Sequence, residues 1–149
     1  MAPFTFLEDI ALSDAAFEAT GATPSELFQS AAQAVIETLA DPRSVAPTWR
    51  RVVERQDQDL ADLLFEWLSD IVYLKDAEGV VFRTAETVVS QETATGPWRL
   101  QGLLMGEPID PKRHELRADV KAVTKHLYEV RREDRHGKEQ WLARVVLDI

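Results

Sequence analysis

The sequence predicts an α+β fold in which two main helices pack on one face of a mostly antiparallel sheet. Two segments carry apolar residues about every three to four positions, the period of a helix with one buried face. Much of the remaining chain alternates between apolar and polar residues, as half-buried strands do. Because the 149 residues contain no internal repeat and no long linker, we expect one domain over residues 1–149, arranged as a two-layer sandwich.

The first part of the chain is predicted to hold two short strands and a helix. Phe4–Leu7 and Ala15–Thr20 have strand-like composition, and Gly21 ends the second of them. Thr23–Glu26 supplies a capping residue, a proline at the first helical position and an acid where a capping box needs one. The helix is expected to end at Asp41–Pro42, because the residue before a proline disfavours helical geometry. Its apolar face is predicted to be core: Leu27, Phe28, Ala31, Ala32, Val35, Ile36 and Leu39.

A strand and a second helix are predicted next. Val45–Arg55 alternates between apolar and polar residues. Asp59 is suited to cap the helix, and Gly79 is suited to the left-handed residue that follows a helix end. The wide apolar face of this helix is also assigned to the core: Leu60, Leu63, Leu64, Trp67, Leu68, Ile71 and Val72.

The rest of the chain reads mostly as strand. Val80–Val89 and Trp98–Met105 form one predicted pair. Ala122–Arg131 and Gln140–Asp148 form a predicted hairpin through the turn-forming residues Asp134–Lys138.

Two further features concern the breaks between strands and the ends of the chain. Gly106–Pro108 is expected to interrupt the strand pattern, and Asp110–Glu115 is expected to form a short helical turn. The strand Phe4–Leu7 and the strand Gln140–Asp148 are expected to share one sheet, which would bring the two ends of the chain together.

The charge balance argues against direct nucleic-acid binding. The chain has 26 acidic and 17 basic residues and a net charge of −9, whereas nucleic-acid binders commonly present a basic face. The basic pairs Arg50–Arg51 and Arg131–Arg132 lie in strand-like segments and are interpreted as parts of a solvated face. A basic protein partner fits this composition better.

The composition also bears on location. No apolar run approaches the roughly 18 residues that span a bilayer, so no membrane association is expected. Met1–Thr5 lacks the basic start and apolar stretch of a signal peptide, and the chain has no cysteine. We therefore expect a cytoplasmic protein.

Carboxylates within apolar strand sequence are the first candidate site. Asp14 precedes one strand and Asp148 ends another, beside the terminal carboxylate of Ile149. Such acids are costly to bury alone, so they are usually paired, hydrogen-bonded or bound to a cation. If the two ends of the chain meet, these groups could form an oxygen-rich metal site, with Glu8 and Asp9 nearby. The alternative is that Asp14 ends a turn and Asp148 lies in a frayed terminus.

Catalytic motifs are scarce. The chain has no phosphate-binding glycine loop and no nucleophile elbow. Its three histidines, His114, His126 and His136, lack the spacing of a helical metal site, and His126 fits a half-exposed strand residue. Lys121 opens an apolar run, where a lysine either extends along a sheet edge to water or presents its ammonium group to a partner.

Several segments match the pattern of a known family, the most specific being Val120–His126. This segment is similar to a Lys-Ala-(Ile/Val)-Thr-Tyr-His signature, and Asp14 stands seven residues before Gly21 as in the family's opening strands. On these segments the chain resembles, over essentially its full length, the archease family, whose members activate RNA-splicing ligases of the RtcB type. Further matching segments are Thr23–Phe28 with Ala31 and Ala32, Leu63 and Leu64 with Trp67 and Leu68, Gly106–Pro108 with His114, and Leu147–Ile149.

Two departures from the family pattern lie close to the matched residues. Many members have His-Thr-Ala directly before the aspartate, where this chain has Ala11-Leu12-Ser13 before Asp14. The tyrosine of the signature is Lys125 here.

The resemblance implies a specific role and site. It implies a two-layer α+β protein with a strand-helix-strand-strand core, which is not itself a ligase. Such a protein promotes guanylylation of an RtcB-type RNA ligase and allows multiple turnover in tRNA splicing or RNA repair. Asp14, Asp148 and the Ile149 main-chain carboxylate would hold a divalent metal ion, with calcium expected first and magnesium or manganese as alternatives. Lys121 and His126 would contact the partner.

Two other classes of function stay open from the sequence. The first is a small metal-dependent hydrolase, in which His126 is the candidate general base. The second is a chaperone-like scaffolding module whose acidic surface binds basic proteins. The second alternative predicts that Asp14 and Asp148 are dispensable.

Overall fold

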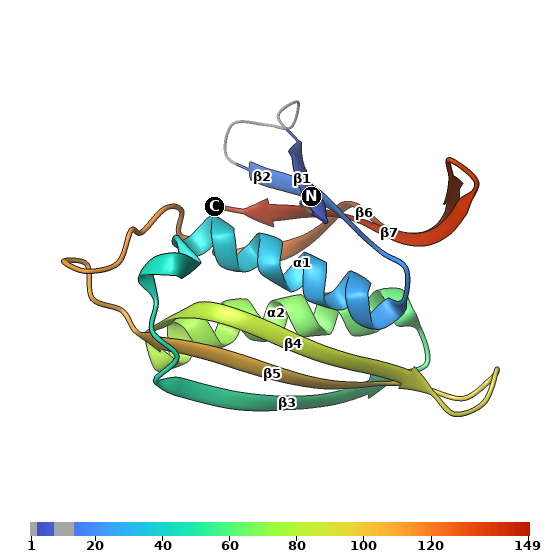
Figure 1. The fold of residues 1–149 in the computed structure, drawn as a ribbon, viewed down its shortest axis with the longest axis horizontal. Helices are drawn as coiled ribbons and strands as arrows, with labels where there is room; N and C mark the ends of the chain where they lie inside the picture. The colour runs from blue at the N-terminus through green and yellow to red at the C-terminus, as the bar shows by residue number, and fades with distance from the viewer. Residues whose placement is uncertain (1–2, 8–13) are drawn as a thin grey trace.

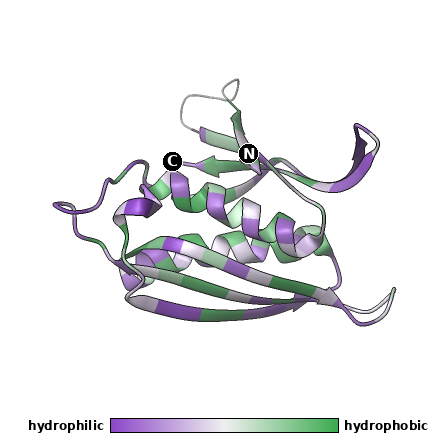
Figure 2. Ribbon diagram, in the orientation of Figure 1, coloured by the Kyte–Doolittle hydropathy of each residue, from purple (hydrophilic) through white to green (hydrophobic). Residues whose placement is uncertain are grey.

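The computed structural model describes residues 3–7 and 14–149, and it has two helices between two antiparallel sheets (Figure 1). Apolar residues occur in both helices and in the strands of both sheets (Figure 2). The elements in chain order are β1 (Phe4–Leu7), β2 (Asp14–Gly21), α1 (Pro24–Leu39), the 3₁₀ turn η1 (Pro42–Ser44), β3 (Trp49–Asp57), α2 (Leu60–Glu78), β4 (Val80–Gln91), β5 (Trp98–Pro108), β6 (Ala122–Arg135) and β7 (Lys138–Asp148).

The strands form a four-stranded sheet of order β1-β2-β7-β6 and a three-stranded sheet of order β3-β5-β4. Neighbouring strands are antiparallel throughout these sheets. The predicted α+β class with two main helices and antiparallel strands is therefore confirmed. The first and last strands, β1 and β7, also share one sheet, as expected. They are not neighbours, because β2 lies between them.

The division into two sheets is the main difference from a single sheet covered by helices. Both helices contact strands of both sheets, so each sheet has the helices on one of its faces. The cause lies in α1, which is buried around most of its circumference rather than along one stripe. Its buried residues are Leu27, Phe28, Ser30, Ala31, Ala32, Ala34, Val35, Ile36, Thr38 and Leu39.

Local capping sets the ends of both helices as predicted. The Thr23 side chain accepts a hydrogen bond from the Glu26 amide at 3.2 Å, with Pro24 at the first helical position. The Asp59 side chain accepts bonds from the first amides of α2, and Gly79 ends that helix at a left-handed φ of 62°. Neither helix has a stretch long and apolar enough to cross a membrane within the described residues.

Trp67 of α2 joins three elements of the core. Its side chain is fully buried, and its indole nitrogen donates to the Phe28 carbonyl of α1 at 3.2 Å. Against β5 the ring lies over Gly102, where an added Cβ would stand 2.7 Å from the indole. The ring therefore fills space that only a glycine leaves open.

Gly106–Pro108 continues β5 instead of interrupting it, so that prediction is wrong. Gly106 pairs with Phe82 and Pro108 pairs with Val80 on β4. A Cβ at Gly106 would stand 2.1 Å from the Val81 carbonyl oxygen, so glycine here permits a close approach of two strands.

Candidate functional site

Asp14 and Asp148 lie directly opposite each other on neighbouring strands. Asp14 begins β2, Asp148 ends β7, and the two are partners in the antiparallel register. Directly opposed residues point to the same face of a sheet, with Cβ atoms about 4.5–5.5 Å apart. Because Phe17 and Leu147 face the core, alternation along each strand directs Asp14 and Asp148 to the outer face, away from the helices. The two aspartates thus occupy opposed positions on neighbouring strands, and their binding of a metal ion stays a prediction.

The two aspartates carry like charges at opposed positions of the sheet. Like charges placed directly opposite each other destabilise a sheet. Within residues 3–7 and 14–149, no lysine, arginine or histidine forms a salt bridge with either carboxylate. Both side chains are half-buried, which limits the screening that water provides. Two adjacent carboxylates are suited to bind a hard divalent cation.

A third protein ligand does not come from another acidic or histidine side chain in the described part of the chain. No group of three such side chains suited to a metal occurs there. Ile149 directly follows Asp148 in the chain, and its side chain packs against the core. Its main-chain carboxylate is therefore next to Asp148 in sequence. Glu8, Asp9 and the segment 11–13 lie outside the described residues.

The backbone of Lys121 is hydrogen-bonded to one member of this pair. Its amide donates to the Asp148 carbonyl oxygen at 2.7 Å, and the next residue, Ala122, is the register partner of Asp148 on β6. The residue is exposed. The structure therefore brings together three of the residues singled out from the sequence, namely Asp14, Asp148 and Lys121.

The segment 109–121, which leads to Lys121, is attached to the end of α1. The Asp41 amide donates to the Glu115 carbonyl at 2.9 Å. The amides of Arg117 and Ala118 donate to the carbonyls of Leu39 and Thr38 at 2.9 and 3.0 Å. These bonds satisfy carbonyl groups that the helix end leaves free, and they fix the path of the segment.

A buried polar cluster holds the start of the same segment. The fully buried His114 side chain accepts a hydrogen bond from the Asp110 amide at Nδ1, 2.9 Å away. Its Nε2 therefore carries the proton and donates to Glu107 Oε1 at 2.8 Å. Hydrogen bonds from Arg113, the Ala46 amide and His114 lower the pKa of Glu107 to about 2.

Lys75 of α2 holds the end of the segment. Its side chain is only 7% exposed, and its ammonium group donates to Asp119 Oδ1 at 2.6 Å and to the Val120 carbonyl at 2.7 Å. Asp76 Oδ1 is its third partner, at 2.9 Å. Burial opposes the charge, but the hydrogen bonds from Lys75 to Asp119 and Asp76 outweigh it and raise the pKa of Lys75 above its ordinary value.

Lys75 and Glu107 are not among the site residues predicted from the sequence. Lys75 follows Ile71 by four positions, which places it on the apolar face of α2. A lysine on an apolar helix face is therefore the signal that could have indicated a buried, partnered ammonium group.

His126 lies in a wide bulge of β6. Thr124 pairs with Val146 and Glu129 with Arg144, so four residues of β6 face one residue of β7. Within the bulge His126 is exposed, and Leu127 has a left-handed φ of 54°. His126 joins no three-ligand metal group in the described residues.

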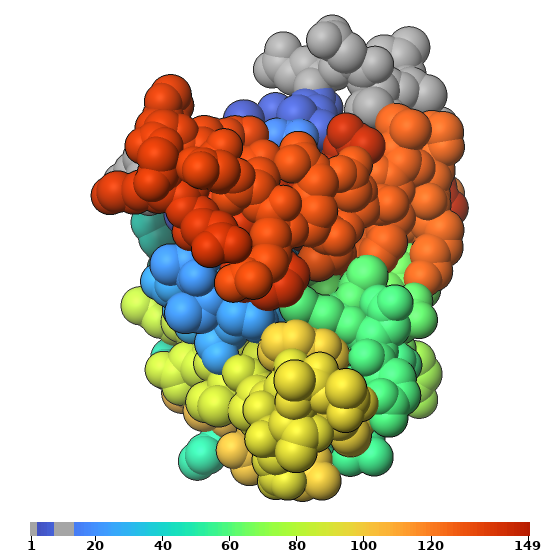
Figure 3. Space-filling model, turned by 90° about the vertical axis from the view of Figure 1, so that its right-hand side faces the viewer, coloured from blue at the N-terminus to red at the C-terminus, as the bar shows by residue number. Residues whose placement is uncertain are grey.

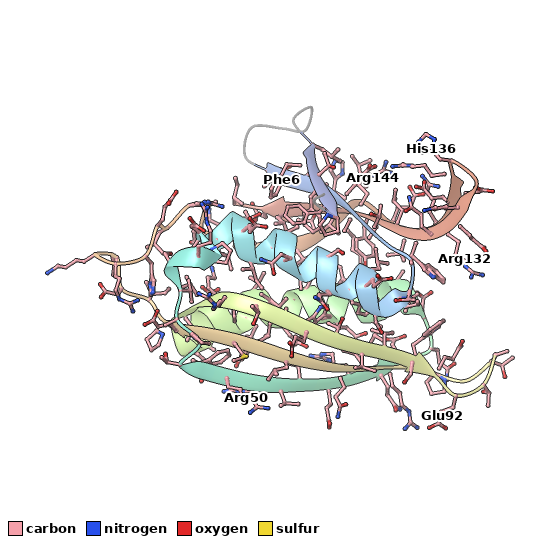
Figure 4. The ribbon with its side chains drawn as sticks, in the orientation of Figure 1. Phe6, Arg50, Glu92, Arg132, His136 and Arg144 are labelled. Carbon is pink, nitrogen blue, oxygen red and sulfur yellow. The ribbon has the colours of Figure 1, made fainter. Side chains whose placement is uncertain are left out.

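The bulge is attached to the start of α2. The Tyr128 hydroxyl donates to the Ala61 carbonyl at 2.5 Å, and Lys125 Nζ lies 3.3 Å from Asp62 Oδ1 and 4.2 Å from the Phe65 ring centre. From the side, the β6–β7 hairpin extends across the starts of both helices (Figure 3). His136 lies in the turn between β6 and β7, at the tip of the hairpin (Figure 4).

The basic pairs noted in the sequence are partly neutralised by acids. Arg51 pairs with Glu78 at 3.0 Å, while Arg50 is exposed on the three-stranded sheet (Figure 4). Arg131 contacts two glutamates, at 2.5 and 3.1 Å. These contacts reduce the positive field that a nucleic-acid surface would need.

A surface hollow of about 490 Å³ lies on the other sheet. It is lined by residues of β3, β4 and β5, among them Glu54, Val88 and Arg99. Asp14 and Asp148 belong to the four-stranded sheet, so this hollow is separate from the carboxylate pair. We take Asp14, Asp148 and Lys121 as the candidate site, and the hollow is not part of it.

Comparison with known proteins gives consistent matches over almost the whole chain. Residues 4–149 match the model of the Archease protein family (MTH1598/TM1083). The chain is 35% identical over 137 residues to Protein archease of Methanopyrus kandleri, covering 92% of this chain and 94% of that protein. It is 31% identical over 137 residues to Protein archease of Pyrococcus furiosus, covering 92% and 93% of the two chains.

A solved structure agrees with these matches. The solution structure of protein 1598 of Methanobacterium thermoautotrophicum superposes with a TM-score of 0.79 at 33% sequence identity, covering 100% of both chains. The chain belongs to the archease family.

Proposed function

We propose that this protein activates an RtcB-type RNA ligase and has no ligase activity of its own. In this proposal it promotes guanylylation of the ligase and multiple turnover in tRNA splicing or RNA repair. The observation that carries the proposal is the register of β2 and β7, in which Asp14 stands opposite Asp148 with no cationic partner among the described residues. Membership of the archease family supports it.

Three groups at the end of the four-stranded sheet would hold a divalent ion. These are the side chains of Asp14 and Asp148 and the main-chain carboxylate of Ile149. Carboxylate oxygens suit calcium, and they also suit magnesium or manganese. A bound ion would supply positive charge toward phosphate groups at the nucleotide site of the ligase.

The remaining residues of the site would orient the partner. Lys121 would direct its ammonium group toward the ligase beside the carboxylates, because its backbone is bonded to Asp148. His126, on the exposed bulge of β6, would contact the same partner. Direct nucleic-acid binding is not part of the proposal, because the chain carries a net charge of −9.

The hydrolase alternative has less support. It needs a general base at the ion, and His126 joins no three-ligand group with Asp14 and Asp148 in the described chain. The scaffolding alternative leaves the opposed carboxylates unexplained, since it does not require them.

The test is a guanylylation and turnover assay of an RtcB-type ligase with substoichiometric amounts of this protein. We expect Asp14→Asn and Asp148→Asn to abolish the stimulation while the fold is retained. Glu18→Gln is the matched control, because Glu18 lies on the same strand and face as Asp14 but opposite Arg144. Full stimulation by the double aspartate variant would refute the carboxylate mechanism. Phosphoester hydrolysis by the protein alone, lost in Asp14→Asn, would favour the hydrolase instead.

The ion is tested separately from the ligase. Calcium and manganese are titrated by calorimetry into the wild-type protein and into a version with added residues after Ile149, which moves the terminal carboxylate. We expect binding to the wild type and weaker binding to the extended chain. Equal binding to both would remove Ile149 from the proposed ligand set.

A further inference from the structure

One peptide group next to the carboxylate pair is held from both sides. The Val120 carbonyl and the Lys121 amide belong to the same planar peptide unit. Its oxygen accepts a hydrogen bond from Lys75 Nζ at 2.7 Å, and its N–H donates to the Asp148 carbonyl at 2.7 Å. With both ends bonded, the plane of this peptide has a single orientation. That orientation fixes the amide nitrogen and Cα of Lys121, from which its side chain leaves the backbone.

The ammonium group of Lys75 is fully used in this arrangement. It has three N–H donors, and its three partners are the Val120 carbonyl, Asp119 and Asp76. The Val120 side chain is itself fully buried, which anchors the peptide from a third direction. Lys75 therefore connects α2 directly to the residue before Lys121.

Lys75 lies on the apolar face of α2, so its ammonium group is taken out of water and depends on the partners that it meets there. Two of these partners belong to residues 119 and 120, directly before Lys121. The contacts of Lys75 thus fix the position of this segment in addition to any stability they add.

Polarisation gives Lys75 a second effect on the site. A cation bonded to a carbonyl oxygen draws electron density from the peptide and makes its N–H a stronger donor. In this peptide the N–H belongs to Lys121 and its acceptor is the main chain of Asp148. The charge on Lys75 would therefore strengthen the bond that joins β7 to Lys121.

We propose that Lys75 is a positioning residue, which orients the Val120–Lys121 peptide and thereby sets Lys121 against Asp148. The part of this inference that concerns ligase activation rests on the proposed function of Lys121 and the carboxylate pair. The part that concerns the peptide depends only on the geometry of the chain itself. The two parts can be tested separately.

The test compares Lys75→Met with the wild type by amide hydrogen exchange and nitrogen–proton correlation spectra of the whole protein. We expect the Lys121 amide to exchange about tenfold faster in the variant, because its hydrogen bond loses the support of a charged donor. Its proton resonance should also shift upfield, while amides in the middle of β7 keep their exchange rates. The thermal unfolding midpoint should fall modestly, because the buried Val120 carbonyl loses its donor.

The matched control is Arg55→Met, which removes a different ion pair of α2. Arg55 bonds Asp70 at 2.5 Å and joins α2 to β3, without contact to the segment 119–121. We expect this variant to leave the Lys121 amide unchanged. If Lys75→Met does not fold, Lys75→Gln takes its place, with the same expected result at Lys121.

Three outcomes separate the two parts of the inference. An unchanged Lys121 amide in the Lys75 variant, or a rise in exchange shared by all of β7, would overturn the positioning role. Faster exchange at Lys121 with loss of ligase stimulation would support both the positioning role and the proposed function. Faster exchange with full stimulation would support the positioning role and overturn the part that concerns ligase activation.

Discussion

The three-stranded sheet and one end of the four-stranded sheet differ in how their charged residues are paired. On the three-stranded sheet, the arginines of β3 that face α2 are paired, Arg51 with Glu78 at 3.0 Å and Arg55 with Asp70 at 2.5 Å. At one end of the four-stranded sheet, two carboxylates oppose each other without a cation among the described residues. These two arginines of the first sheet are compensated, whereas the two aspartates at the end of the second have no cationic partner among the described residues.

This difference indicates where function is to be sought. A local arrangement that costs stability persists when something else selects for it, and such sites are commonly sites of binding or catalysis. The contrast makes two kinds of prediction. Changes at the three-stranded sheet should lower stability, and neutralising the carboxylate pair should raise it.

The largest effect is expected from Trp67→Ala, at the contact between α2 and the three-stranded sheet. The side chain is fully buried and its indole donates to the Phe28 carbonyl. Removing it leaves a large cavity and deletes the indole hydrogen bond to the Phe28 carbonyl, so the free energy of unfolding should fall by about 3–5 kcal/mol. Urea denaturation measures this change, with Tyr73→Ala, an exposed residue of the same helix, as the control. A loss below about 1 kcal/mol would show that the core relaxes around the site.

Gly102→Ala changes the other side of this contact, on β5, and should cause the next largest loss of stability. The added Cβ would lie 2.7 Å from the Trp67 ring, and the ring cannot move away without displacing other core residues. We expect the free energy of unfolding to fall by about 1–3 kcal/mol. Combining it with Trp67→Phe, which shortens the side chain at this position, should recover part of the loss in thermal denaturation. No recovery would mean that the strain lies in the backbone of β5.

Local signals in the sequence account for most of the secondary structure. The caps at Thr23 and Asp59 and the glycine at position 79 involve neighbouring residues, and the helices begin and end there. Strand pairing across the chain carries no such local signal. The division of the strands into two sheets therefore could not be predicted, although the presence of the first and last strands in one sheet could.

The candidate site shows the same division. The meeting of Asp14 with Asp148 was predictable because each interrupts apolar strand sequence, and its metal stays a prediction. Lys75 was missed because its partners lie 44 and 45 residues away in the chain. The bulge around His126 was missed because its residues continue the composition of a strand.

The buried cluster at the end of β5 should make the three-stranded sheet sensitive to acid. The pKa of Glu107 is lowered to about 2, from an ordinary value near 4.5. Its stabilising contribution is therefore complete above about pH 4.5 and is lost as the pH falls toward 2. Thermal midpoints of Glu107→Gln should lie below those of the wild type at neutral pH, and the gap should close over this range. A gap independent of pH would mean that the shape of Glu107 matters rather than its charge, and Glu54→Gln serves as the exposed control.

The smallest effect is expected at the carboxylate pair, and its sign is the informative part. In metal-free buffer, Asp14→Asn removes one of two opposed like charges, so the free energy of unfolding should rise by about 0.2–1 kcal/mol. Added calcium should raise the thermal midpoint of the wild type but not that of the variant, because binding to the folded state stabilises it. Glu18→Gln, on the same strand and face but opposite Arg144 rather than a carboxylate, should not be stabilised, since it relieves no pair of opposed like charges. A destabilised Asp14→Asn would mean that Asp14 has a stabilising partner, and the contrast between the two sheets would then fail.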